Sequence, residues 1–160
     1  MSEPDRSADA VDHRRLAVDL FNSVWKLIDK ADRTAAEDLA MIHSAHASRY
    51  HWGLAGEAKN WCIGEWQIAR VYATLGRAEP SRFHAAEALR LAEASHLGPF
   101  LLASAHEGMA RAAMVAGDAA EFDRHIAEAE RIGVDITGEE DHDIWRADLD
   151  SLRRPGPEPG

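Results

Sequence analysis

A short pattern that recurs every 41 residues is the feature that most constrains the fold of this chain. Histidine, two alternate alanines and arginine share one spacing in three segments, which are 43–49, 84–90 and 125–131. Upstream of the pattern, Trp25 recurs as Trp66, again 41 residues later. Self-similarity at this length is typical of proteins built from stacked supersecondary units. The chain is therefore expected to be a repeat protein.

Helix start and stop signals divide each unit into two helices. Thr34 with Glu37 and Thr137 with Glu140 fit the capping box, and glycines follow most apolar segments. Pro99 suits the first turn of a helix, where its missing N–H has no intrahelical partner. The signals predict seven helices, at about 10–30, 34–52, 57–75, 80–95, 99–116, 119–132 and 138–152.

The second helix of each unit carries small or apolar residues at i, i+4, i+7 and i+10, which form one stripe of a helix. The stripe residues are Ala40, Ser44, Ala47 and Tyr50, then Ser81, Ala85, Ala88 and Leu91, then Phe122, Ile126, Ala129 and Ile132. The stripe is expected to face the partner helix, since alanine lets two backbones approach closely. The predicted fold is all-α, with three stacked hairpins and a C-terminal capping helix in one domain over 10–152. Residues 1–9 and 153–160 are expected to be disordered.

Part of the pattern resembles the tetratricopeptide repeat. Ile68-Ala69, Tyr72, Gly76, Ser81 and Ala88 fall at the spacing of that family's conserved positions, and Met109-Ala110 through Gly117 to Ala129 repeat it. The resemblance covers about 35–133 and implies an α-solenoid. Its usual unit is about 34 residues, so 41 implies longer helices or connections. The stretch 46–52, with Gly-Glu-Trp-Gln at 64–67, is also similar to small bacterial proteins of this type, which implies a fold and no activity.

In the tetratricopeptide family, the first helix of each hairpin lines a concave groove for a protein segment. By this resemblance, the groove positions are Trp25, Asp29, Trp66, Arg70, Glu107 and Arg111. The tryptophans would supply flat contact area and the arginines forked donors for carboxylates. The alternative is that both tryptophans lie in the core and the arginines pair with local carboxylates.

Histidines near the end of the second predicted helix allow a different function. His43, His46 and Tyr50 lie on one helix face. A side chain on a neighbouring helix could complete a metal shell with them, and the candidates are Glu65, His84, His106 and Glu107. The alternative function is therefore a metal-binding protein or an enzyme that uses His43, His46, Tyr50 and Glu65. The competing interpretation uses the repeat itself. His43, His84 and His125 are equivalent by 41-residue steps, as structural positions would be, and could donate to backbone carbonyls.

Charge and composition narrow the class of partner. The net charge of −10 argues against nucleic acid and anionic membranes, and no long basic run exists. The single cysteine, Cys62, is expected to be a buried thiol in a reducing compartment, and the cytoplasm is the expected location. The sequence has no hydrolase elbow, phosphate loop or dinucleotide fingerprint. We therefore expect an adaptor without catalysis or cofactor, which binds a protein or peptide, with self-association as a variant of that class.

Overall fold

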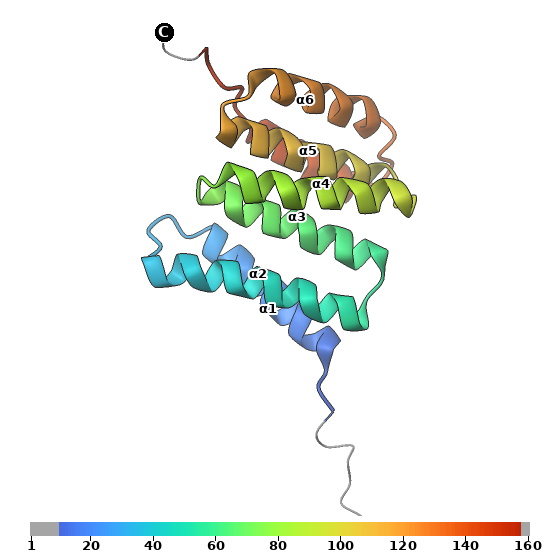
Figure 1. The fold of residues 1–160 in the computed structure, drawn as a ribbon. Coiled ribbons are helices and arrows are strands. Elements are labelled where there is room, and N and C mark those ends of the chain that lie inside the picture. Colours follow the sequence, from blue (N-terminus) through green and yellow to red (C-terminus); the bar gives the residue numbers. More distant parts are fainter. Residues whose placement is uncertain (1–9, 158–160) are drawn as a thin grey trace, which may run out of the picture.

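A computed structural model describes residues 10–157 of the chain, which form seven α-helices and no strand (Figure 1). The helices are α1 (His13–Ile28), α2 (Ala35–Ala55), α3 (Ala58–Thr74), α4 (Ala78–Ala94), α5 (Pro99–Ala116), α6 (Ala119–Gly133) and α7 (Glu139–Asp150). All seven predicted helices are confirmed, with ends within a few residues of those expected. Disorder was expected for 1–9 and 153–160; of these, 1–9 and 158–160 fall outside the described residues, and 153–157 follow α7 without helix or strand.

Local capping explains where most of these helices begin. Thr34 accepts a hydrogen bond from the backbone N–H of Glu37, whose carboxylate accepts from the N–H of Thr34, so α2 begins with the predicted capping box. Asp118 likewise accepts from the N–H of Glu121 at the start of α6. Pro99 opens α5, as expected. These contacts satisfy N–H groups that have no partner inside the helix.

One predicted capping box is wrong. Gly138, not Thr137, occupies the N-cap of α7, and no side chain caps that helix. The first turn instead carries three carboxylates, at 139–141, which interact favourably with the positive end of the helix dipole. Interaction of these carboxylates with the helix dipole therefore stabilises the start of α7, where a side-chain cap was expected.

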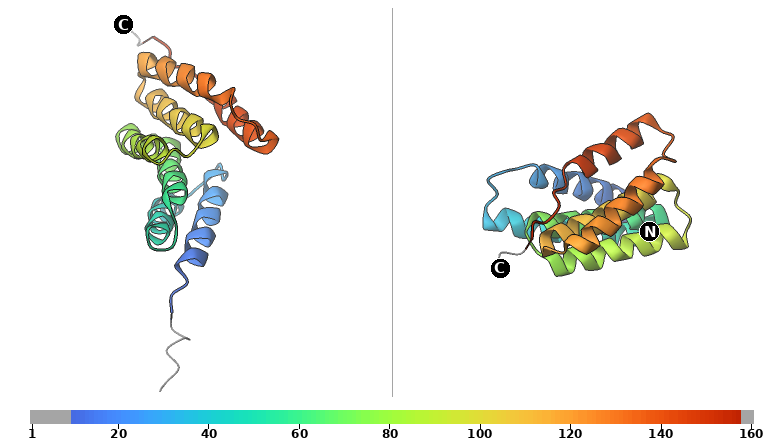
Figure 2. Two further views of the ribbon diagram at one scale, coloured as in Figure 1. Left: turned by 90° about the vertical axis from the view of Figure 1, so that its right-hand side faces the viewer. Right: turned by 90° about the horizontal axis from the view of Figure 1, so that it is seen from above.

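The helices stack as three antiparallel hairpins, α1–α2, α3–α4 and α5–α6, followed by α7. Helices α1, α3, α5 and α7 lie on one side of the stack and α2, α4 and α6 on the other, which is clearest when the stack is seen from above (Figure 2). The predicted all-α architecture of stacked hairpins with a final helix is thus confirmed. One side of the molecule is made entirely of the odd-numbered helices.

Small side chains allow the hairpin helices to pack closely. Ala45, Ala88 and Ala129 are almost completely buried in α2, α4 and α6. Two buried serines add a hydrogen bond across the hairpin to the backbone of its first helix. Ser48 Oγ donates to the carbonyl of Ala17 at 2.7 Å, and Ser81 Oγ donates to that of Ala69 at 2.9 Å. Their hydroxyls are therefore satisfied inside the core.

The predicted stripe faces the core in α4 and α6, whereas in α2 the buried positions lie one or two residues later than predicted. The residues that α2 buries are Met41, Ala45, Ser48 and Trp52. Ala40 is exposed, and 65% of the Tyr50 surface is accessible. The shift turns the buried face by about 100°. Met41 and Trp52 select this face, because burying their larger apolar surface stabilises the fold more than burying Ala40 and the phenol of Tyr50.

Gly133, in the last turn of α6, determines how closely α7 packs. A Cβ atom at this position would lie 2.1 Å from Cζ2 of Trp145, a rigid indole buried between α7 and the last hairpin. We expect Gly133→Ala to lower the free energy of unfolding by about 1–3 kcal/mol, since the ring has to move. Chemical denaturation followed by circular dichroism measures the change.

Gly53→Ala in the exposed part of α2 is the matched control. A Cβ atom there meets only the guanidinium end of Arg49, at 3.4 Å. This substitution is expected to raise stability by about 0.5–1 kcal/mol, because alanine is the better helix former. Equal stability of the two variants would contradict the assigned packing role of Gly133.

Candidate binding groove

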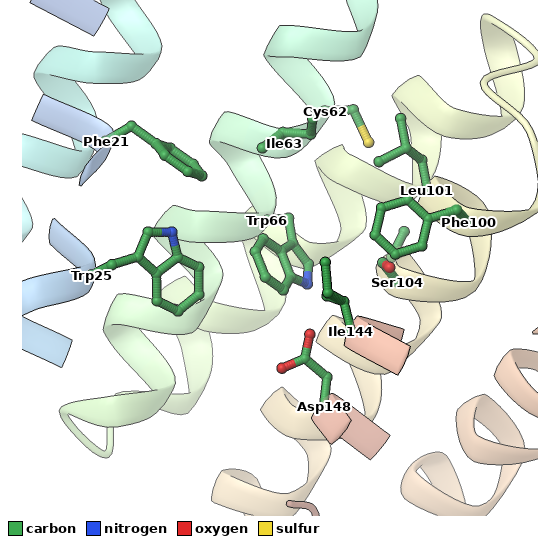
Figure 3. A pocket seen from close by; sticks show the side chains of 11 residues that line it. Phe21, Trp25, Cys62, Ile63, Trp66, Phe100, Leu101, Ser104, Ile144 and Asp148 are labelled. Atoms are coloured by element: carbon green, nitrogen blue, oxygen red, sulfur yellow. The ribbon is translucent and has the colours of Figure 1, made fainter. Parts of the chain in front are cut away.

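A cavity of about 310 Å³ opens on the side of the molecule made by the odd-numbered helices (Figure 3). All four of these helices contribute to its wall, which is almost entirely apolar. The lining residues are Phe21 and Trp25 of α1, Cys62, Ile63 and Trp66 of α3, Phe100, Leu101, Ser104 and Ala105 of α5, and Ile144 and Asp148 of α7. We call this cavity the central pocket.

The two tryptophans of the central pocket form a pair around a largely buried cation. The ring centroids of Trp25 and Trp66 lie 5.6 Å apart. The guanidinium carbon of Arg70 lies 5.7 Å from the centroid of Trp25 and 5.3 Å from that of Trp66. At these distances the electron-rich ring faces attract the guanidinium. The interaction holds the indoles in position at the base of the pocket.

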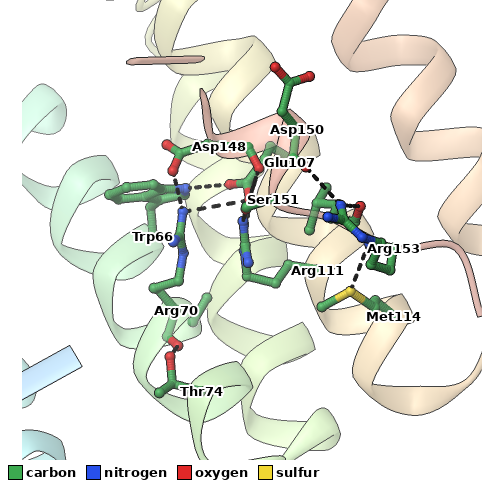
Figure 4. A network of polar contacts seen from close by, with 12 residues as sticks. Trp66, Arg70, Thr74, Glu107, Arg111, Met114, Asp148, Asp150, Ser151 and Arg153 are labelled. Carbon is green, nitrogen blue, oxygen red and sulfur yellow. Dashed lines mark hydrogen bonds and ion pairs between the residues drawn. The ribbon is translucent and has the colours of Figure 1, made fainter. Parts of the chain in front are cut away.

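Arg70 also belongs to a polar network that connects α3, α5 and α7 (Figure 4). Its Nη2 atom donates to Asp148 Oδ1 at 2.7 Å and lies 3.7 Å from Glu107 Oε1. Arg111 Nε donates to Glu107 Oε1 at 2.7 Å, and Trp66 Nε1 donates to Glu107 Oε2 at 3.1 Å. Arg111 also reaches Ser151, beyond the end of α7. The fully buried Glu107 carboxylate is thereby compensated by two cations and an indole N–H.

Asp148 is the one ionisable side chain of the network that also lines the central pocket. Burial raises the pKa of its carboxyl group, and the nearby Arg70 guanidinium opposes this rise. Its Oδ1 atom is occupied by Arg70, while Oδ2 makes no hydrogen bond to any described residue. The carboxylate therefore has unused acceptor capacity on the pocket wall.

The structure places the six predicted groove residues in three different settings. Trp25 and Trp66 line the central pocket. Arg70, Glu107 and Arg111 lie in the network beneath it, paired with each other and with α7. Asp29 follows the end of α1, is exposed and does not line the pocket.

Sequence reasoning missed the apolar walls and the contribution of α7. Phe21, Ile63 and Phe100 line the pocket beside the tryptophans, and Ile144 and Asp148 close it from α7. In the α7 sequence, Ile144 and Asp148 directly precede the buried Trp145 and Leu149. Helical spacing therefore places these two residues on the face next to the buried one. Their distance from α3 along the chain concealed the contact.

The pocket continues into two neighbouring hollows. One shares Phe21 and Ile63 with it and extends along α1 toward Trp52. The other shares Ile63, Phe100 and Leu101 and extends to the start of α7, where Lys59 and Asp141 lie on its walls. The three hollows together form an elongated groove across the odd-numbered helices.

Of the residues in the metal hypothesis, His46 and His84 lie side by side, with ring centroids 5.2 Å apart. His43 is exposed, His46 Nε2 lies 3.0 Å from the hydroxyl of Tyr72, and Glu65 binds both Arg49 and His84. Within residues 10–157, no group of three or more histidine, cysteine or acidic side chains has an arrangement suited to a metal ion. Cys62 is buried, its thiol lies 3.4 Å from the carbonyl of Ala88, and burial raises its pKa to about 12.

The expected equivalence of three histidines holds for two of them. His84 Nδ1 contacts Glu65 Oε2 at 2.6 Å, and His125 Nδ1 contacts His106 Nδ1 at 3.0 Å, so both join the two helices of their hairpin at one repeat position. His43 does not share this environment, because α2 is rotated by one residue relative to the prediction.

Comparison of the chain with protein-family models, curated proteins and solved structures found no match. No helix in the described part of the chain has both the length and the apolar character that a membrane crossing requires. The candidate site therefore has to be interpreted from its own geometry and chemistry.

The His106–His125 contact predicts how stability depends on pH. Burial lowers the pKa of His106 to about 4 and also lowers that of His125, so folding disfavours the protonated form of both imidazoles. In the unfolded chain histidine titrates near pH 6.5, at about its ordinary pKa. Their contribution to stability is therefore fully present above about pH 6.5 and is lost as the pH falls toward 4, because the unfolded state then binds more protons.

Urea denaturation at several pH values between 7.5 and 4 measures this dependence. We expect His106→Gln to give a shallower loss of stability on acidification than the native chain, since one neutral buried imidazole is absent. His43→Gln, at an exposed position, should retain the native slope. Parallel pH profiles for the native chain and His106→Gln would contradict the assignment.

Proposed function

We propose that this protein is a binding module of tetratricopeptide-like type, whose groove holds a segment of another protein. The observation that carries the proposal is the central pocket, an apolar cavity walled by all four odd-numbered helices. Packing of the hairpins with alternate helices along one side supports the tetratricopeptide-like assignment. In such stacks, the side formed by the first helices is a natural binding surface.

The shape of the groove favours a chain segment over a compact small molecule. The central pocket alone has the size of a small ligand site. Because Ile63 and the residues beside it are shared with hollows on both sides, an elongated ligand gains further contact area along the groove. A segment that places one apolar side chain in the central pocket could contact the two neighbouring hollows with its flanking residues.

The tryptophans are proposed to supply most of the affinity. Trp25 and Trp66 are held by Arg70 and by neighbouring rings, so they lose little freedom when a ligand covers them. Arg70 and Arg111 were expected to orient a partner's carboxylates. Since both are already paired with carboxylates of this chain, their role in the proposal is to hold the walls of the groove.

Selection from a random peptide library displayed on phage tests the proposal without a known partner. Peptides selected on the native chain are expected to bind Trp25→Ala/Ile144→Ala at least about tenfold more weakly, because central aromatic contacts contribute about 2 kcal/mol or more. Fluorescence anisotropy measures the affinities. Neither side chain makes a hydrogen bond to a described residue, which favours retention of the fold, and circular dichroism checks it.

Leu39→Ala/Phe83→Ala is the matched control. Both residues are exposed apolar side chains on α2 and α4, away from the pocket lining. The control is expected to bind the selected peptides as the native chain does. A library that yields no binder, or binders that ignore the pocket variant, would overturn the proposed function.

A further inference from the structure

The inner face of α7 combines apolar contact with negative charge. Asp141, Ile144 and Asp148 are spaced for one face of the helix, and all three line the groove. Ile144 remains 45% exposed, so it is available to a ligand. The α7 wall thus offers an apolar side chain with a carboxylate on each side.

Negative charge continues outward from this wall. Glu139, Glu140, Asp141 and Asp143 are exposed at the start of α7, and none forms an ion pair with a described residue. Among the residues that line the three hollows, Lys59 is the single cation, while Asp141 and Asp148 are the carboxylates. The opposite walls, on α1 and α3, are mainly apolar. Charge and apolar surface are therefore arranged on different sides of one groove.

Asp148 supplies a second contact of the same chemistry inside the pocket. Its Oδ1 atom is paired with Arg70, and its Oδ2 atom has no partner among the described residues. The indole of Trp66 lies near it (Figure 3), and the guanidinium of Arg70 lies over the rings of both Trp25 and Trp66. A positively charged side chain placed there would meet the free Oδ2 atom of a partly desolvated carboxylate.

We propose that the partner segment is basic and amphipathic. Its apolar side chains would enter the central pocket against α3, and its lysine or arginine side chains would lie against Asp148, Asp141 and the acidic start of α7. This inference rests on the proposed function and adds the chemistry of the ligand. The net charge of −10 also favours approach of a cationic segment.

Two labelled synthetic peptides test the inference on the full chain. Both are amphipathic helices of about five turns with the same leucine positions, one with lysine and the other with glutamate at every polar position. Anisotropy is expected to show at least about tenfold tighter binding of the lysine peptide, with a difference that falls as salt is added. Equal affinities that Trp25→Ala/Ile144→Ala reduces would overturn the charge preference while leaving the groove intact.

Two double variants with the same change in net charge distinguish the effect of the α7 carboxylates on binding from the effect of overall charge. Asp141→Asn/Asp148→Asn is expected to weaken binding of the lysine peptide about fivefold or more. Its new amide at 148 still offers an acceptor to Arg70, and Asp141→Asn alone provides a milder second variant. Glu93→Gln/Glu130→Gln, at exposed positions on α4 and α6, is expected to bind nearly as the native chain does.

The remaining outcomes are distinct. An equal loss of binding in both double variants would overturn the inference, because the lysine peptide would then respond only to overall charge. Failure of both peptides to bind a native chain that does bind library-selected peptides would overturn the inference alone, and failure of the library as well would overturn the proposed function. Retention of native affinity by both Asp141→Asn and the Asp141→Asn/Asp148→Asn variant, with native circular dichroism, would exclude α7 as the contact.

Discussion

The buried carboxylate of Glu107 imposes the strictest requirement on this fold. A fully buried charge is costly unless cations and hydrogen-bond donors surround it, and here Arg70, Arg111 and the Trp66 indole do so. These groups come from α3 and α5, and through Asp148 they also hold α7. Compensation of one charge thus brings three helices together around the groove. The apolar walls then follow from where those helices lie.

Much of the fold was predictable because its determinants are local. Capping residues such as Thr34 and Asp118 and the stop signals at glycines act within one turn, so the seven helices follow from short stretches of sequence. The register of α2 was harder to predict. Identical residue types at 43 and 84 suggested one alignment, but burial of Met41 and Trp52 requires another. Packing energy, which depends on the neighbouring helices, determined the face.

The candidate site was predictable only in part, for a related reason. The recurrence of Trp25 as Trp66 pointed to two of the four aromatic residues that line the pocket, and Phe21 and Phe100 follow no repeat. The pairing of Arg70 with Asp148 spans 78 residues and follows no repeat, so no periodic pattern could reveal it. Likewise, Glu107 has the repeat position of Trp66 but a buried charge, and its partners became evident only in three dimensions.

The contact between Arg70 and Asp148 also affects how the stack holds together. In a simple array each hairpin touches only its neighbours, so the last helix can detach without consequence for the rest. Here an ion pair with most of its surface shielded from solvent joins α7 to α3, beyond its immediate neighbours. Detachment of α7 would leave Arg70 without its aspartate and would loosen the tryptophan pair. The protein is therefore expected to unfold as a single cooperative unit rather than fray from its C-terminal end.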